Sequence, residues 1–464
     1  MDKTTVRLSS IRIHNIKNVE NGMITMPNAS KKSFTADKAE ILGIYGQNGS
    51  GKTAVVDVFF FLQKIMIGDS LDEEFGNYIE ANSDQAEIQA DFNVFKNSVI
   101  YEISYHIYLK KIDQTVIIEK ETLSSARNED DKRSNKIVFM NYDRNCADII
   151  FTPKKRLDEL AGTNKEILTD LIVAKKLAEK SNCSYIFGES SREVFNKNNT
   201  GKFGKYAFLI NSLFYFALRD LFVIRNSHSG VITANFILPM AFRIDGNKTG
   251  MKGDFVVPLT KPVLLNKGKK EILEAIVEQI NTVLYTIIPG LMISIKNYGP
   301  QLLDSGEDGW KVELMSHRDG RPDIPIRMES EGIIKIISIL NALIQAFGNP
   351  SICLVIDELD AGIFEYMLGE LLEIFQKSAK GQLIFTSHNL RALEMLETKN
   401  IIFSTANPNN RYIRMKNVGG TNNLRNLYIR SITLGGQDEV IYEETDSLKI
   451  ARAFRKAGRS VRDA

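Results

Sequence analysis

The chain has 464 residues, of which 43% are hydrophobic and 25% are charged, and its formal net charge is +2. This composition is typical of a globular protein with a large core and more than one lobe. The near-neutral charge excludes a protein that coats nucleic acid through a generally basic surface. The three cysteines (Cys146, Cys183 and Cys353) are far apart in sequence. Their spacing argues against a zinc site or a disulfide framework and fits a reducing cytoplasm.

The N-terminal region is predicted to form strands. Residues 6–13 and 22–26 have the pattern of two short strands joined by a turn, and residues 41–45 form an apolar strand that ends at a glycine. The N-terminus has no signal-peptide pattern. We therefore expect a cytoplasmic protein without a membrane segment.

A glycine-rich stretch, which we call the P-loop, follows the 41–45 strand and fits the pattern G-x-x-x-x-G-K-[ST]. It reads Gly46, Gln47, Asn48, Gly49, Ser50, Gly51, Lys52, Thr53. An apolar helical stretch, 54–67, comes next, so strand, loop and helix appear in the order that a phosphate cradle requires. An accidental glycine turn would lack this context. Lys52 can reach the β- and γ-phosphates, and the hydroxyl of Thr53 can bind Mg²⁺.

Alternating apolar and polar residues after this helix predict an antiparallel β layer. The predicted strands are 86–94, 99–109, 115–122 and 136–140. The charged segment 124–134 is expected to be a solvated loop or hairpin tip.

The composition changes at Pro153, and the apolar spacing from 154 to 225 becomes helical. Residues 188–204, rich in glycine, serine and asparagine, are expected to be a flexible loop. The apolar window 206–224 contains Asn211, Arg219 and Asp220, which favours a buried helix over a membrane span. This region is predicted to be an inserted helical lobe.

Strands and helices alternate again in the C-terminal half. Strands are predicted at 236–242, 254–259, 291–295 and 310–316, and an amphipathic helix at 269–288.

Two acids close the apolar run 351–358. Such a run is typical of a buried parallel strand with carboxylates at its C-terminal end. Asp357 would hold Mg²⁺, and Glu358 would accept a proton from the water that attacks the γ-phosphate. Surface acids after a core strand are the alternative, but the intact P-loop favours the functional reading.

Two further segments carry candidate site residues. A predicted strand, 382–386, is followed by His388, which could sense a γ-phosphate, although a lone histidine is more often structural. Ser330, Glu331 and Gly332, which we call the signature segment, precede an apolar helix at 333–347. A helix start with a hydroxyl and free backbone N–H groups can bind an anion, and by itself it would be only a helix cap.

The order of these motifs resembles the ABC-type ATPase heads of SMC, Rad50 and RecF proteins. It looks closest to the AAA15 and OLD-like ATPases of bacterial anti-phage systems, such as the ATPase subunits of the PARIS, Septu and AbiL types. The resemblance covers roughly residues 5–150 and 235–430. It implies that the signature segment contacts ATP held by another protomer, that Asp360 belongs to the D-loop and that His388 is the switch histidine.

The chain departs from these families in several places. The signature segment lacks the Leu-Ser-Gly-Gly form, and Gln85 and Gln89 are both candidates for the Q-loop glutamine. The insertion is too short and too irregular for a long coiled-coil arm. Single-chain OLD nucleases continue into a Toprim domain of about 100 residues or more, but only about 50 residues follow Met415, so no intrinsic nuclease is expected.

The resemblance implies an α/β fold: an ABC-type P-loop ATPase head with a mixed sheet, an antiparallel β layer and an inserted helical lobe. The predicted parts are 1–153 for the first half of the head, 154–235 for the lobe, 236–437 for the second half and 438–464 for a charged tail. The tail is expected to end in a helix at 448–461, with Arg452, Arg455, Lys456 and Arg459 on one face. That helix is either solvated or a docking helix.

Three functions follow from this reading. The favoured one is an ATPase that binds ATP and Mg²⁺ between protomers and controls a separate nuclease or toxin effector in an abortive-infection system. Its partners would be further copies of itself and that effector, with a phage protein or DNA as trigger. The alternative is a DNA-repair or DNA-clamping ATPase of the RecF or Rad50 kind. A membrane-transporter subunit is the weakest candidate because the inserted parts do not fit a compact transporter head.

Overall fold

The computed structural model describes residues 4–29, 35–130, 132–162, 164–197, 201–225, 237–244, 251–258, 261–303, 305–415 and 424–460. Its central sheet has the strand order β19-β18-β3-β17-β16-β9. These strands are β3 (Glu40–Tyr45), β9 (Leu221–Ile224), β16 (Cys353–Ile356), β17 (Gln382–Ser387), β18 (Ile401–Ser404) and β19 (Tyr412–Ile413). All neighbours pair in parallel except β18 and β19.

Both faces of the central sheet are buried. Along β3, Leu42 and Ile44 join one hydrophobic core, and Ile41 and Tyr45 join another. Successive side chains of a strand point to opposite faces, so a strand covered on both sides is apolar throughout. This explains why the parallel strands appear in the sequence as continuous apolar runs.

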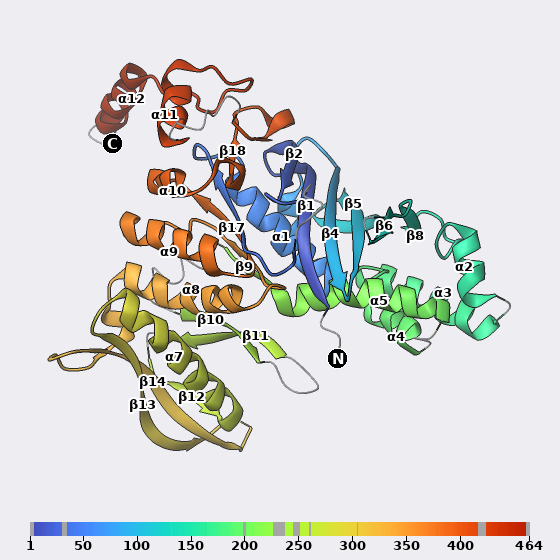
Figure 1. Cartoon of the computed structure of the whole chain (residues 1–464), viewed down its shortest axis with the longest axis horizontal. Coiled ribbons are helices and arrows are strands. Elements are labelled where there is room, and N and C mark those ends of the chain that lie inside the picture. The colour runs from blue at the N-terminus through green and yellow to red at the C-terminus, as the bar shows by residue number, and fades with distance from the viewer. Residues whose placement is uncertain are drawn as a thin grey trace.

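A seven-stranded antiparallel sheet shares the first core. Its order is β2 (Val19–Thr25), β1 (Thr5–Ile16), β4 (Gln85–Lys96), β5 (Val99–Ile112), β6 (Thr115–Glu129) and β7 (Lys132–Arg133), with β8 (Ile137–Asp143) also paired to β6. Helix α1 (Lys52–Met66) belongs to the same core (Figure 1). The predicted antiparallel layer is confirmed. The loop expected at 124–134 is wrong in its first half, because β6 continues to Glu129 and pairs there with β5.

The predicted helical region begins as expected with α2 (Lys154–Ala161), α3 (Lys165–Ser181) and α5 (Gly201–Tyr215). Two details differ. The expected 188–204 loop contains α4 (Glu189–Lys197), and the helix expected through Ile224 ends in a π-helical turn over 216–220. Leu221–Ile224 form β9 instead, because their backbone pairs in parallel with β16 in the central sheet. Residues 226–235 of the expected lobe lie outside the described part.

The C-terminal half contains the hairpin β10 (Ile237–Ile244) and β11 (Met251–Pro258), and a sheet in which β14 (Asp308–Arg318) lies between β12 (Val263–Asn266) and β13 (Leu291–Leu302). The short strand β15 (Ile324–Pro325) also pairs with β14. The helices are α7 (Lys267–Ile287), α8 (Glu331–Gly348), α9 (Glu365–Ser378), α10 (Leu390–Met395), α11 (Leu424–Leu434) and α12 (Ser447–Ser460). Helices α7 to α10 contribute to the second core. The expected strand ends at 236 and 259 lie outside the described residues.

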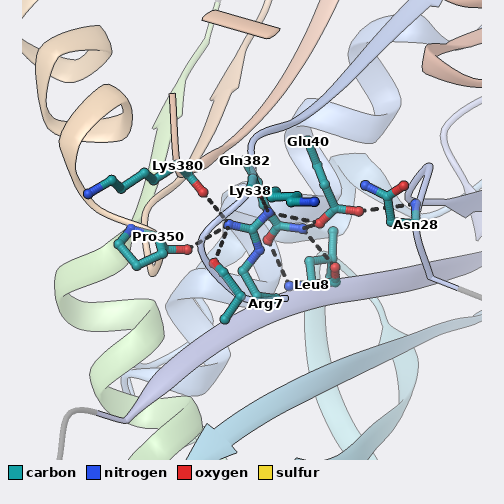
Figure 2. A network of polar contacts seen from close by, with 9 residues as sticks. Arg7, Leu8, Asn28, Lys38, Glu40, Pro350, Lys380 and Gln382 are labelled. Carbon is teal, nitrogen blue, oxygen red and sulfur yellow. Dashed lines mark hydrogen bonds and ion pairs between the residues drawn. The ribbon is translucent and has the colours of Figure 1, made fainter. Parts of the chain in front are cut away.

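A buried polar network fastens the antiparallel sheet to the central sheet (Figure 2). Arg7 of β1 is only 1% exposed and donates hydrogen bonds to the carbonyls of Pro350 (2.8 Å) and Lys380 (2.5 Å) and to Glu40 Oε2 (3.0 Å). Gln382 exchanges two 2.8 Å hydrogen bonds with the backbone of Leu8. The network joins β1 to the N-terminal ends of β3 and β17, while the P-loop lies at the other end of β3. It therefore holds the two sheets together without occupying the P-loop end.

Within the described ranges, one helix is long and apolar enough to cross a membrane by length and composition, namely α8. More than half of its apolar window is buried inside the protein. Helix α8 therefore packs as a core helix here.

Candidate functional site

The P-loop connects β3 to α1 and depends on its glycines. Gly49 and Gly51 have φ angles of 80° and 91°, in the left-handed region that glycine adopts without strain. Lys52 begins α1, and its Nζ donates hydrogen bonds of 2.9 Å to the carbonyls of Gly46 and Gln47. The loop thus curls around the lysine ammonium, as a phosphate cradle requires.

Lys52 is buried, with 6% of its surface exposed. Burial lowers the pKa of its ammonium, and the nearby charges of Asp357 and Glu358 oppose that shift. The lysine therefore lies within electrostatic reach of the acids that end β16. Residues more than 300 positions apart in sequence meet because β3 and β16 both end at the same edge of the sheet.

A hydroxyl and a carboxylate suited to magnesium lie together at this edge. Thr53 Oγ1 is 3.4 Å from Asp357 Oδ1, which also accepts a 2.6 Å hydrogen bond from Thr386 Oγ1. Asp357 is 1% exposed, and its Oδ2 has no hydrogen-bond partner among the described residues. A buried, unsatisfied carboxylate oxygen is costly unless a ligand completes it. Oxygen ligands of this kind, with phosphate oxygens, fit Mg²⁺.

Glu358 follows Asp357 in a strained turn. Its φ of 50° is unusual for a residue other than glycine, and such strain often marks functional sites. The backbone holds it there: its N–H donates to Thr386 Oγ1 (2.7 Å), and its carbonyl accepts from Lys335 Nζ (2.8 Å). These bonds fix the backbone of Glu358 at the end of β16.

His388 lies just beyond β17 at the same sheet edge. Its backbone N–H donates to Asp360 Oδ2 (3.0 Å), which ties the histidine to the turn after β16. Desolvation by the surrounding protein lowers the pKa of the exposed His388 side chain, and the positive charge of Lys52 lowers it further. The lowered pKa favours a neutral imidazole, which can both accept and donate a hydrogen bond.

The signature segment lies at the exposed start of α8. Ser330 is the N-cap of α8, is exposed, and uses no side-chain hydrogen bond for capping. A Cβ on Gly332 would lie 2.2 Å from the carbonyl oxygen of Gly362, so the start of α8 packs directly on the turn that contains Asp360. In the described part of the chain, no hydrogen bond or ion pair joins Ser330 or Glu331 to the P-loop.

The structure adds residues that brace the P-loop and that motif reading missed. Asn18, in the turn between β1 and β2, donates to the carbonyl of Gly49, and Arg411 donates to the carbonyl of Asn18. Tyr412 Oη donates to the Gly51 carbonyl (2.7 Å). No local sequence pattern distinguishes these side chains from ordinary turn residues.

A segment of the tail also contacts the P-loop. The backbone N–H of Glu443 donates to Gln47 Oε1 (2.9 Å), and the Gln47 amide returns a 3.4 Å hydrogen bond to the Glu443 carbonyl. Glu439 accepts from Asn407 and Asn410, and Ile441 is 3% exposed. The chain before α12 is therefore attached to the head.

Neither candidate for the Q-loop glutamine lies on a strand of the central sheet. Gln85 and Gln89 are both on β4, where Gln89 hydrogen-bonds with Asp91 and Ser104. The strand beside Asp357 is β9, and Arg225 follows it. Arg225 donates to Tyr78 Oη (2.9 Å) and lies 3.9 Å from the carboxylate of Asp57 on α1.

Over the described ranges, no group of three or more histidine, cysteine, aspartate or glutamate side chains gathers in a metal-binding arrangement. Thr53 and Asp357 would hold Mg²⁺ together with the phosphates of a nucleotide, and the ion would neutralise their negative charge.

Comparisons with solved structures find SMC and RecF heads. The SMC head bound to the C-terminal winged-helix domain of ScpA is 13% identical, with a TM-score of 0.44, and the match covers 88% of this chain and 97% of that chain. The SMC head domain from Thermotoga maritima is 12% identical (TM-score 0.35; 89% and 100% covered), and RecF with ATP is 10% identical (TM-score 0.33; 83% and 94% covered). A search of curated proteins finds no match.

A protein-family model described as "AAA domain, putative AbiEii toxin, Type IV TA system" matches residues 41–394, well over half of the chain. The matched range begins in β3, immediately before the P-loop, and includes Asp357, Glu358 and His388. The chain belongs to this AAA-domain family.

Proposed function

We propose that the protein is an ATPase whose heads associate when ATP is bound between two protomers. Lys52 and the P-loop backbone, including Gly46, Asn48, Ser50 and Gly51, would hold the phosphates in one protomer. Thr53 and Asp357 would hold Mg²⁺. The signature segment of the other protomer would complete the site.

One observation carries this proposal. The half of the site around Lys52 is assembled within the chain, whereas Ser330 and Glu331 are exposed and, among the described residues, form no hydrogen bond or ion pair with their own P-loop. Gly332 rests on Gly362, so the signature segment and the turn after Asp360 lie side by side. An exposed helix start that is not bonded to its own P-loop is suited to the phosphate of another protomer.

Hydrolysis would use the residues at the end of β16 and β17. Glu358 would accept the proton of the attacking water, and His388 would hydrogen-bond to the γ-phosphate. When Mg²⁺ is bound, it supplies charge neutralisation at the β- and γ-phosphates. Asp360 keeps His388 in place through the backbone hydrogen bond of 3.0 Å.

The biological role that we propose is anti-phage defence in the cytoplasm. Joined heads would hold a separate nuclease or toxin effector and release or activate it after a phage protein or phage DNA is sensed. The family description supports this direction because it names a toxin of a toxin–antitoxin system. The motif order, which resembles the ATPase subunits of defence systems, supports it as well.

Purification of the native complex tests the role. A nuclease or toxin that co-elutes with the parent protein and is controlled by ATP would support the defence proposal. Tight ATP-dependent binding of duplex DNA by the chain alone would instead favour a RecF-like or Rad50-like clamp. Lys52→Ala is the control, since either function should be lost without nucleotide binding.

A further inference from the structure

The residue just before the signature segment is held by an unusually complete set of contacts. The side chain of Glu329 is 6% exposed, and its Oε1 accepts hydrogen bonds from Ser316 Oγ (2.5 Å) and Arg318 Nε (3.1 Å). Its Oε2 accepts from Arg318 Nη2 (2.9 Å). Both oxygens are therefore engaged by side chains of β14, in the two-pronged geometry that makes arginine–carboxylate pairs directional.

The carboxylate remains charged in this position. Burial alone would raise the pKa of Glu329, but the hydrogen bonds from Arg318 and Ser316 outweigh it and lower the pKa. The same contact raises the pKa of Arg318. Removing Arg318 would leave the nearly buried charge of Glu329 without compensation, which is more costly than losing an exposed pair.

The other side of the signature segment is fixed to the end of β16. Gly332 lies against the carbonyl of Gly362 with no room for a side chain. One turn further along α8, Lys335 is 5% exposed and donates to the carbonyl of Glu358 (2.8 Å). The start of α8 is thus a bridge between β14 on one side and the turn that carries Glu358 on the other.

We propose that Arg318 and Glu329 are positioning residues that fix Ser330, Glu331 and Gly332 for contact with the nucleotide of the other protomer. This inference rests on the proposed function, because it requires a site shared between protomers. Because Arg318 and Glu329 form an ion pair, a shift of the β13–β14 hairpin would also shift the signature segment.

The precision required of a phosphate contact explains why such a pair matters. Displacing a catalytic contact by about 1 Å can reduce a rate by about 100-fold. By contrast, an ion pair with no positioning role contributes only modestly to stability and leaves the rate of hydrolysis unchanged. If Arg318 and Glu329 position the signature segment, their loss should lower the rate of ATP hydrolysis by the joined heads. If they are only structural, their loss should lower the stability of the protein and leave that rate unchanged.

Arg318→Ala and Glu329→Ala in the full-length chain test the proposal. We expect ATP affinity of the dilute, monomeric protein to stay within about twofold of the parent, because Lys52 and Thr53 are untouched. ATP-dependent association and turnover should fall at least about tenfold. The exchange Arg318→Glu with Glu329→Arg should recover part of both, since the pair is restored in reverse.

A second ion pair on the same strand provides the matched control. Arg327, which precedes Glu329 by two residues, forms an ion pair with Glu313 of β14. Glu313→Gln should change turnover by less than about threefold. The assignment is overturned if Arg318→Ala associates and turns over like the parent. It is also overturned if monomer ATP affinity falls as much as turnover, or if Glu313→Gln is equally damaging.

Failure of the proposed function would look different. Glu358→Gln, which should trap ATP, serves as the reference for head association. If the parent and Glu358→Gln both stay monomeric with ATP, the shared-site model fails and the positioning proposal fails with it. If both associate and Arg318→Ala associates equally well, only the positioning proposal fails.

Discussion

The two halves of the candidate site differ in how complete they are within one chain. Around Lys52, side chains from α1, β16 and β17 meet, and Thr386 hydrogen-bonds to both Asp357 and the backbone of Glu358. Around Ser330, the contacts fix the backbone and leave the hydroxyl exposed. From this difference we predict that the single chain binds nucleotide, whereas rapid hydrolysis requires a second one.

Loss of the P-loop ammonium should have the largest effect. Lys52→Ala removes the charge that faces the β- and γ-phosphates, so ATP binding, association and any protection of cells should all be abolished. Lys64→Ala on the same helix, where Lys64 pairs at the surface with Asp69, is the control and should behave like the parent. Titration with a fluorescent ATP analogue measures the difference. ATP hydrolysis by Lys52→Ala at the parental rate would refute the phosphate-cradle assignment.

Replacing the proposed base should separate binding from hydrolysis. Glu358→Gln keeps the shape of the side chain but removes the proton acceptor, so turnover should fall about 100- to 10,000-fold while ATP stays bound. The mass measured with ATP should rise, because joined heads no longer hydrolyse their nucleotide. Glu365→Gln, an exposed acid at the start of α9, is the control. Unchanged turnover would rule out Glu358 as the base.

A methyl group at the signature glycine should damage only the shared half of the site. Gly332→Ala places a Cβ 2.2 Å from the Gly362 carbonyl, so the start of α8 must shift. We expect at least a tenfold loss of ATP-dependent association and turnover, with ATP affinity of the monomer nearly unchanged. Gly348→Ala at the end of the same helix meets no atom within 4 Å and is the control. A variant that lost monomer binding equally would contradict the division into two halves.

Truncations of the tail should distinguish its attachment from its final helix. Removal of everything after Asp446 deletes α12 but keeps the Glu443 contact to Gln47, so ATP affinity should be unchanged. Removal after Gly436 also deletes that contact and should weaken ATP binding about two- to tenfold, the value of one or two hydrogen bonds. Equal affinities for the two truncations would show that the contact with Gln47 has no role in binding. A loss of effector binding after the shorter deletion would assign docking to α12.

The smallest expected effect is on the pH dependence of stability. The contributions of Glu329, beside the signature segment, and of Asp57, on α1, the P-loop helix, should change in opposite directions with pH. The pKa of Glu329 is lowered, so its contribution to stability is present above the ordinary glutamate range and is lost as the pH falls through the lowered value. Burial raises the pKa of Asp57 on α1, so its carboxylate favours the folded state less as the pH rises through the raised value.

Melting temperatures measured between about pH 3 and 7 test these opposite pH dependences. This interval spans the ordinary pKa of a carboxyl group, about 4. The difference in melting temperature between the parent and Glu329→Gln should become smaller as the pH falls. Over the same change, the melting temperature of the parent should rise relative to that of Asp57→Asn. Parallel trends for the two variants would contradict the assigned shifts.

The helical region from 154 to 225 packs as part of the head. Its apolar residues share one core with α1 and the antiparallel sheet, and β9 at its end pairs with β16. Burial inside the head explains the apolar window at 206–224 without a second protomer. We also predict that this region helps to build a higher assembly; a deletion confined to its helices, which spares β9, would test this by the measured mass of the protein.

The sequence alone determined the local chemistry of the nucleotide site. The glycine pattern from Gly46 to Thr53, the apolar strand before Asp357 and Glu358, and the cap before α8 all depend on neighbours within a few residues. Short-range sterics and hydrogen bonding decide such features, so each motif could be assigned its element and its chemistry. The alternating pattern of the antiparallel sheet was predicted for the same reason.

Only the tertiary structure decided which distant segments meet. Leu221–Ile224 are apolar and continue a helical pattern, yet they form a strand because the edge of β16 offers backbone partners that the local sequence cannot show. The bracing of the P-loop by Asn18, the contact of Gln47 with Glu443 and the pairing of Arg318 with Glu329 likewise join residues from separate elements. Their side chains are ordinary in sequence, and their roles arise from burial and proximity that exist only once the sheets have assembled.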